Sequence, residues 1–219
     1  VAAHRAAELT RQLLAYSGKG KIVVEPVDLS ALVREMGRLL SAAMSKKAYV
    51  TTELRDDLPP VHADATQLRQ VVMNLITNAS DALGDAPGTI TIRTRRMHAT
   101  RAWLAGAQEG ADLPEGEYLV LEVTDTGSGM TAESMSRLFD PFYSTKGPGR
   151  GLGLAAVLGI VRGHRGALRI VASGEHGTTV AVLLPVAVAE DGQPIAEHPA
   201  ETCGTVLVVD DDVSALRVA

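Results

Sequence analysis

The sequence predicts an α/β fold, a two-layer sandwich in which a mixed β-sheet lies against three helices. Helical and strand patterns are interleaved along residues 22–185, as in domains that pack helices on a sheet. The longest helical patterns each carry one apolar face, which must be buried against another layer. The strand patterns are short, rich in β-branched residues and bounded by turn residues. These observations together indicate one sizeable core.

A helix is predicted ahead of the sandwich, in residues 1–18. Its apolar residues recur at a spacing of three and four in a narrow seam, and Ser17–Gly20 ends the pattern. Such a seam favours packing on a partner helix, although an ordinary surface helix has the same periodicity. A short strand is predicted next, at residues 22–24.

A second helix is predicted to run to Ala43, with Asp28 or Ser30 as its N-cap. Residues 49–54 predict a strand and residues 57–60 a turn. This helix supplies the first of the three apolar faces.

The third helix, residues 65–83, is the most regular pattern in the chain. Asp64 is suited to cap it, and Gly84 follows its end. At about 100° per residue, its apolar side consists of Leu68, Val71, Val72, Leu75, Ile76, Ala79 and Leu83. The opposite stripe is mostly amides: Gln67, Gln70, Asn74, Asn78 and Asp81.

The amide stripe is as consistent with a functional, ligand-binding face as with an ordinary solvent-exposed face. Asn74 and Asn78 are four residues apart and point the same way. Exposed helix faces favour Lys, Glu and Arg, and asparagine is a poor helix former. Because Mg²⁺ accepts neutral amide oxygens while it keeps water and phosphate ligands, the stripe can hold a magnesium–nucleotide complex.

Further elements are predicted in the second half of the chain. They are strands at 89–95, 117–124, 167–172 and 178–184, a short helix at 133–138, a third apolar helix at 152–162, and an insertion or short helix within 98–116.

Two glycine-rich runs carry the remaining chemical signals. After a strand, Asp125 can accept a hydrogen bond from an exocyclic amine such as that of adenine, while Gly127 and Gly129 let the backbone approach a flat base. Ordinary turns use the same residues. Residues 147–154 precede a helix and offer free N–H groups and the positive helix end to phosphate, with Lys146 adding positive charge.

The second run does not follow a strand, so it does not fit a dinucleotide-binding fingerprint. Phe139 and Phe142, the only phenylalanines, lie between the runs. They predict a hinged lid pinned by apolar contacts, or else two ordinary core residues.

In order, the motifs resemble the catalytic ATP-binding domain of sensor histidine kinases, which shares the Bergerat fold with type II topoisomerases and mismatch-repair ATPases. The matching segments are the N box at 74–79, a glycine box at 125–130, the F box at 138–146, a second glycine box at 149–154 and a Gly–Thr motif at 174–179. The ordered set is specific, although no single motif is.

The resemblance implies ATP and Mg²⁺ as cofactors. It assigns to ATP the residues Asn74, Asn78, Asp81, Asp125, Gly127, Gly129, Lys146, Gly151, Leu152, Gly153 and Thr178. Asn78 and Asn74 would face Mg²⁺, Asp125 would bind the adenine amine, and Phe139 and Phe142 would belong to the lid. Some relatives carry a basic residue at the position of Asp81.

The flanks fit the same resemblance. Asp210 and Asp211 resemble the magnesium-binding acids of a response-regulator receiver. The implied domains are 1–18, the second helix of a dimerisation domain; 22–185, the ATP-binding domain; 186–203, a linker; and 204–219, the start of a receiver. The parent is then expected to be a homodimeric hybrid kinase whose partners are a phosphoacceptor histidine domain and a receiver. The acceptor histidine belongs to a helix absent here, so this piece is not expected to phosphorylate itself.

The implied activity is transfer of the ATP γ-phosphoryl group to a histidine. In the related ATPases a glutamate occupies the position of Asn74, and an amide cannot take a proton from water. That difference favours a kinase over an ATPase. Two alternatives stay open, namely a protein serine kinase of the anti-sigma type and a non-catalytic nucleotide-sensing module.

Composition narrows the remaining possibilities. The net charge of −5 argues against nucleic acid as the main partner. The single cysteine, Cys203, excludes an internal disulfide and fits a reducing compartment. The longest apolar run, residues 180–189, is too short to cross a bilayer. We therefore expect a cytoplasmic piece without membrane contact, and a chain that opens at valine is expected to be a fragment.

Overall fold

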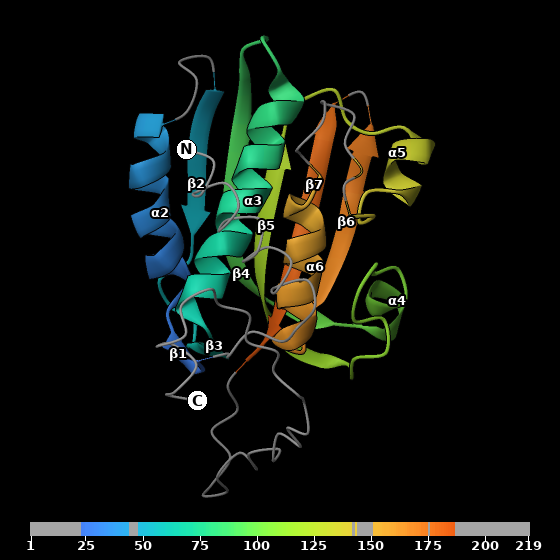
Figure 1. Cartoon of the computed structure of the whole chain (residues 1–219). Helices are drawn as coiled ribbons and strands as arrows, with labels where there is room; N and C mark the ends of the chain where they lie inside the picture. The colour runs from blue at the N-terminus through green and yellow to red at the C-terminus, as the bar shows by residue number, and fades with distance from the viewer. Residues whose placement is uncertain (1–22, 44–47, 142, 144–150, 175, 187–219) are drawn as a thin grey trace, which may run out of the picture. The chain divides into compact units, whose positions relative to one another are not determined.

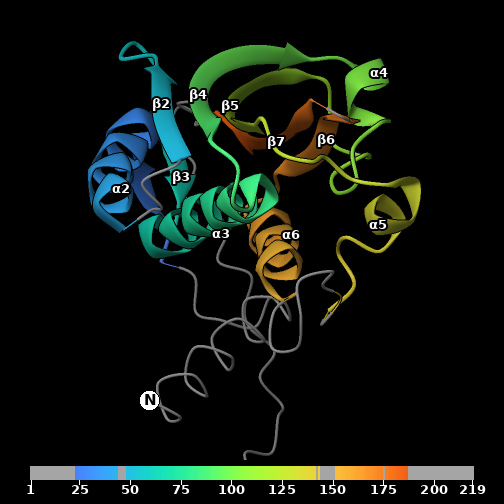
Figure 2. The same cartoon turned by 90° about the horizontal axis from the view of Figure 1, so that it is seen from above.

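The computed structural model describes residues 23–43, 48–141, 143, 151–174 and 176–186 (Figure 1). A five-stranded sheet forms one layer. Helices α2 (Leu29–Ala43), α3 (Ala65–Leu83) and α6 (Gly153–Gly163) lie together on one of its faces (Figure 2). The predicted two-layer sandwich with three helices on one side is confirmed.

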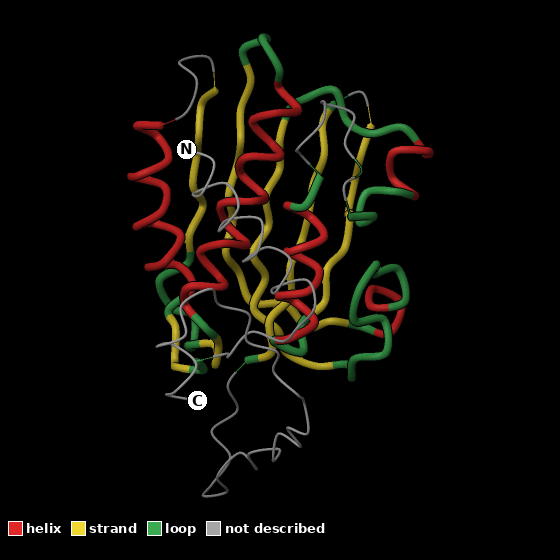
Figure 3. The backbone as a smooth tube through the Cα atoms, viewed as in Figure 1, coloured by secondary structure: helices red, strands yellow, loops and turns green. Residues whose placement is uncertain are grey.

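The sheet is mixed, as predicted, and its strands lie side by side (yellow in Figure 3). Its strand order is β2-β4-β5-β7-β6, and only the β2–β4 pair is parallel. The strands are β2 (Ala48–Leu54), β4 (Gly88–Ala99), β5 (Gly116–Asp125), β6 (Ala167–Gly174) and β7 (Gly177–Pro185). Strand β4 continues past the predicted end at residue 95, because its antiparallel pairing with β5 extends to Ala99 opposite Gly116.

Helix α3 has the bounds that the sequence predicts. The Asp64 carboxylate caps it by accepting hydrogen bonds from the backbone N–H groups of Thr66 and Gln67 at 2.9 and 3.1 Å. Its buried residues are those of the predicted apolar side: Leu68, Val71, Val72, Leu75, Ile76, Ala79 and Leu83. Of the two candidate caps for α2, Asp28 does the capping, since it accepts from the Ala31 N–H.

The predicted strand at residues 22–24 is wrong. Strand β1 is Glu25–Val27, and it pairs with β3 (Val61–Ala63), which the sequence did not indicate. Residues 23 and 24 are exposed, and the Val23 N–H donates instead to the Asp64 carboxylate. Proline at position 26 fits the edge of this two-stranded sheet, where no donor is required on its outer side.

The main core fills the space between the helices and the sheet. A smaller cluster covers the opposite sheet face beneath α4 (Arg101–Leu104), the short helix between β4 and β5. Strand β5 therefore contributes Leu119 and Leu121 to the main core and Tyr118 and Val120 to the smaller one. Burial on both faces explains the unbroken apolar run at residues 118–121 of β5. Each large aliphatic side chain in such a core contributes about 1.5–3 kcal/mol.

Hydrogen bonds join both ends of helix α6 to α3 or to its N-cap residue. At its start, the Asn74 side chain donates to the Gly153 carbonyl oxygen at 3.1 Å. At its end, buried His164 accepts a hydrogen bond at Nε2 from the Asp64 backbone N–H at 3.0 Å. Because Nδ1 lies 2.8 Å from the Ile160 carbonyl oxygen, the geometry fits a neutral ring protonated at Nδ1. These contacts set the first turn of α6 beside the middle of α3.

Several predictions lie outside the described residues. These are the helix at 1–18, the linker beyond residue 186, the segment 204–219 with Asp210 and Asp211, and the side chains of Phe142 and Lys146. Within the described residues, no helix is both long and apolar enough to pass through a bilayer.

Candidate functional site

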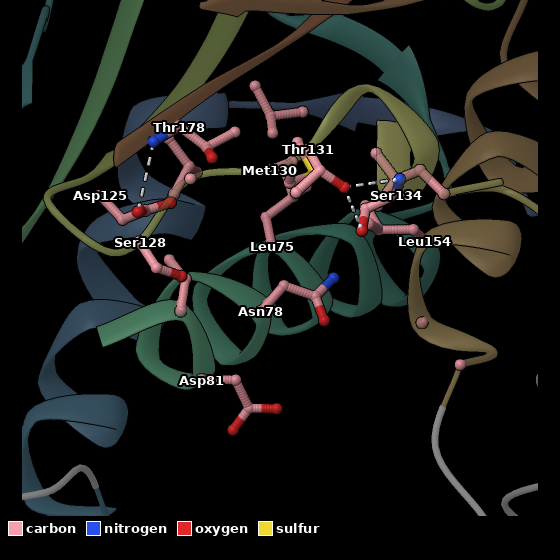
Figure 4. A pocket seen from close by; sticks show the side chains of 18 of the residues that line it. Leu75, Asn78, Asp81, Asp125, Ser128, Met130, Thr131, Ser134, Leu154 and Thr178 are labelled. Carbon is pink, nitrogen blue, oxygen red and sulfur yellow. Dashed lines mark hydrogen bonds between the residues drawn. The ribbon is translucent and has the colours of Figure 1, made fainter. Parts of the chain in front are cut away.

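A cavity of about 590 Å³ lies between α3, the ends of β5 and β7, and the segment that contains α5 (Ala132–Ser136) (Figure 4). Its volume is within the range of small-molecule sites. The start of α6 also borders it. The predicted site residues that line this cavity are Asn78, Asp81, Asp125, Gly129, Gly151, Gly153 and Thr178.

One end of the cavity is built around a buried carboxylate. Asp125 ends β5 and is 5% exposed. Its Oδ1 accepts hydrogen bonds from the backbone N–H groups of Gly127 at 2.8 Å and Thr178 at 3.3 Å. Figure 4 shows the carboxylate beside Thr178. Two N–H donors fix its orientation, so it offers a rigid acceptor to a ligand amine.

The two glycines that follow Asp125 are required by contacts within the protein. A Cβ on Gly127 would lie 2.5 Å from the Ala82 carbonyl oxygen at the end of α3. Gly129 has φ of +66°, and a Cβ there would collide with the Gly174 carbonyl. Only Gly129 of the two lines the cavity. The close approach seen here is to neighbouring backbone, and the approach of these glycines to a flat base stays a prediction.

Helix α3 presents Asn78 and Asp81 to the same cavity (Figure 4). The Asn78 Nδ2 atom is buried and has no hydrogen-bond partner among the described residues. Asn74, one turn earlier, is not among the residues that line the cavity, and its NH₂ group is bonded to Gly153. The two asparagines of the amide stripe therefore have different surroundings.

The start of α6 supplies backbone N–H groups. Gly151, at φ of +107°, and Gly153 line the cavity, while Leu152 between them is buried and is not a lining residue. Leu152 occupies the N-cap position and makes no side-chain capping bond. The first N–H groups of a helix have no partner within the helix. An anion in the cavity could therefore accept hydrogen bonds here and meet the positive helix end.

Some lining residues were missed by sequence reasoning. Ser128, Met130, Thr131, Ser134, Tyr143 and Leu154 belong to this group. Thr131 carried a signal, because it caps α5 by accepting from the Ser134 N–H at 3.1 Å. Ser173 carried none: its Oγ accepts from the Met130 N–H at 2.9 Å and lies 3.2 Å from the Thr178 hydroxyl, so it contacts two residues that line the cavity.

Phe139, predicted as part of a lid, is partly buried and packs against the main core. Its packing fits both the lid interpretation and the core interpretation. That Phe139 belongs to a lid stays a prediction.

Comparison with known proteins gives one matching family. The sequence profile described as "Histidine kinase-, DNA gyrase B-, and HSP90-like ATPase" matches residues 63–188. The sensor kinase CckA of Brucella abortus (strain 2308) is 38% identical over 96% of this chain and 23% of its own length. The sensory histidine kinase/phosphatase NtrB of Rhizobium leguminosarum bv. phaseoli is 34% identical over 83% of this chain and 46% of its own length.

Among solved structures, the catalytic domain of the histidine kinase ThkA has a TM-score of 0.60 and 26% identity, over 75% of this chain and 96% of its own. The chain thus spans less than half the length of CckA and of NtrB, but corresponds to nearly the whole catalytic domain of ThkA.

Proposed function

Because this chain belongs to the family of histidine kinase-, DNA gyrase B- and HSP90-like ATPases, we propose that its cavity binds Mg-ATP for histidine phosphorylation. The γ-phosphoryl group would pass to a histidine of a dimerisation domain in a two-component signalling protein. The observation that carries this proposal is that Asp125, Asn78 and the start of α6 border one cavity.

The cavity offers complementary groups to the two ends of ATP. The Asp125 carboxylate accepts a hydrogen bond from the exocyclic amine of adenine, and Thr178 and Gly129 line the cavity with it. The positive end of α6 and the N–H groups near Gly151 and Gly153 receive the phosphates. Lys146 would add positive charge there, as the sequence predicts. Gly127, Leu152 and Asp81 are proposed to shape or border this site.

The amides of α3 fit a magnesium ion. The oxygen of Asn78 is a neutral hard ligand of the kind that Mg²⁺ accepts beside phosphate and water. Its buried, unpartnered NH₂ group is costly without an acceptor, which a bound phosphate would supply. Asn74 is the second predicted magnesium-facing residue. When bound, the ion would neutralise the charge that develops on the phosphate oxygens.

Phosphoryl transfer to histidine depends on positioning. The lone pair of a neutral imidazole nitrogen attacks the γ-phosphorus while the bond to the oxygen of ADP breaks. Imidazole is nucleophilic near neutral pH, so the cavity need not supply a base. Water would need one, and Asn74, with its NH₂ group bonded to Gly153, cannot serve. These features favour transfer over hydrolysis.

The proposed partners follow from this reaction. A dimerisation domain would supply the acceptor histidine, and a response-regulator receiver would then take the phosphoryl group. The segment 204–219 is proposed as the start of such a receiver. Because ATP is the proposed phosphoryl donor, the reaction is proposed to take place in the cytoplasm.

Incubation with γ-labelled ATP tests the proposal. We expect label on a separately supplied dimerisation domain that carries the acceptor histidine, and none on this chain alone. The bond should be acid-labile, as phosphohistidine is. Acid-stable label on a protein substrate would instead indicate a serine kinase. Tight ATP binding without transfer to a dimerisation domain would indicate a nucleotide sensor.

A further inference from the structure

One contact joins the amide stripe to the start of α6. Asn74 Nδ2 donates to the Gly153 carbonyl oxygen at 3.1 Å, and Gly153 is the first residue of the helix. A Cβ on Gly153 would lie 3.7 Å from Asn74 Oδ1 and 3.8 Å from Asn78 Nδ2. The helix therefore begins directly against both amides, yet only Asn74 is hydrogen-bonded to it in the described structure.

This contact is well placed to orient the first turn of α6. The N-cap residue Leu152 provides no side-chain acceptor, so its side chain does not fix the direction of the first N–H groups. The bond to Gly153 fixes the first peptide carbonyl of the helix, and with it the Leu154 N–H, which belongs to the same peptide plane. The far end is separately fixed by His164 on Asp64. Loss of the Asn74 contact would free one end of a helix that is held at two points.

We propose that Asn74 is a positioning residue that acts through Gly153, rather than a direct ligand of the magnesium ion. It holds the start of α6 so that the N–H groups near Gly151 and Gly153 point at the phosphates. The proposal rests on the function proposed above and deepens it. Asn78, which lines the cavity, keeps the metal-facing role.

The two roles for Asn74 need opposite ends of its amide. Positioning needs the NH₂ group, because Gly153 offers only a carbonyl acceptor. Metal ligation needs the oxygen. Asn74→Asp removes the donor and keeps an oxygen ligand, so it separates the roles. Asn74→Ala removes both.

Calorimetric titration with a non-hydrolysable ATP analogue, in Mg²⁺ and in EDTA, measures the difference. We expect Asn74→Asp and Asn74→Ala each to weaken binding by about tenfold, and by the same factor in both buffers. Asn78→Ala should lose more affinity in Mg²⁺ than in EDTA. Thr77→Ala is the control, because Thr77 is exposed on the same helix. Wild-type affinity of Asn74→Asp in Mg²⁺, where Asn74→Ala binds more weakly, would overturn the proposal.

Amide hydrogen exchange of the nucleotide-free protein gives a second readout. The amides of Ala156 and Val157, among the first five residues of α6, should exchange several-fold faster in both Asn74 variants. Amides near the His164 end and in α3 should keep wild-type rates, which general destabilisation would not produce. Unchanged exchange at Ala156 and Val157 would contradict the proposal. If wild-type protein bound no nucleotide, the proposed function would fail, while exchange would still decide whether Asn74 holds α6.

Discussion

Asn78→Ala is expected to weaken binding of Mg-ATP by about a hundredfold, since even indirect partners of a metal commonly contribute ten- to a hundredfold. The variant removes the amide that α3 presents to the cavity, and with it the oxygen proposed to face the ion. It also removes a buried NH₂ group that has no protein partner in the described structure, so the fold should not suffer. Calorimetry with and without Mg²⁺, together with urea unfolding, measures both effects.

The matched control for Asn78→Ala is Thr77→Ala, which changes the neighbouring exposed residue of α3. Equal losses of affinity in Mg²⁺ and in EDTA would show that Asn78 contacts the nucleotide without the metal. If the affinity is unchanged in both conditions, Asn78 takes no part in nucleotide binding.

Asp125→Asn is expected to weaken ATP binding by about a hundredfold and to reduce the preference for adenine over guanine. If the new side chain keeps its oxygen toward the N–H groups of Gly127 and Thr178, its NH₂ group faces the cavity. It would then oppose the adenine amine but could donate to the guanine carbonyl. Competition binding with ATP and GTP measures the change in preference.

Because asparagine keeps one acceptor for the two backbone donors, Asp125→Asn should unfold at nearly the wild-type urea concentration. Asp125→Ala provides the comparison, as it leaves two backbone N–H groups without that acceptor and should be less stable. An equal loss of ATP and GTP affinity in Asp125→Asn would mean that the carboxylate does not read the base.

The elements predicted best from the sequence are those determined by interactions between residues that are close in the chain. Helix α3 was predicted with its cap, its end and its buried face, because each depends on residues within a few positions of one another. Strand β3 was missed because three residues carry too little periodicity, and its pairing with β1 joins residues about forty positions apart. The full length of β4 likewise depended on its partner β5.

The candidate site was predicted as a set of residues, but not as a set of contacts. The sequence motifs named Gly127 and Gly129, while their contacts with Ala82 and Gly174 depend on the ends of α3 and β6 meeting the same loop. Ser173 carries no motif and acts only through Met130 and Thr178. Long-range packing of this kind has no local signal in a single sequence.

Asn78, Asp125 and the start of α6 are proposed to surround one metal-bound triphosphate. Paramagnetic relaxation in the NMR spectrum with Mn²⁺ in place of Mg²⁺, and an ATP analogue, measures this arrangement most directly. We expect the amide signals of Gly151 and Gly153 and the side-chain signal of Asn78 to broaden together, only when nucleotide is present. Broadening elsewhere in the protein, with these three signals sharp, would show that the ion and its nucleotide bind at another place.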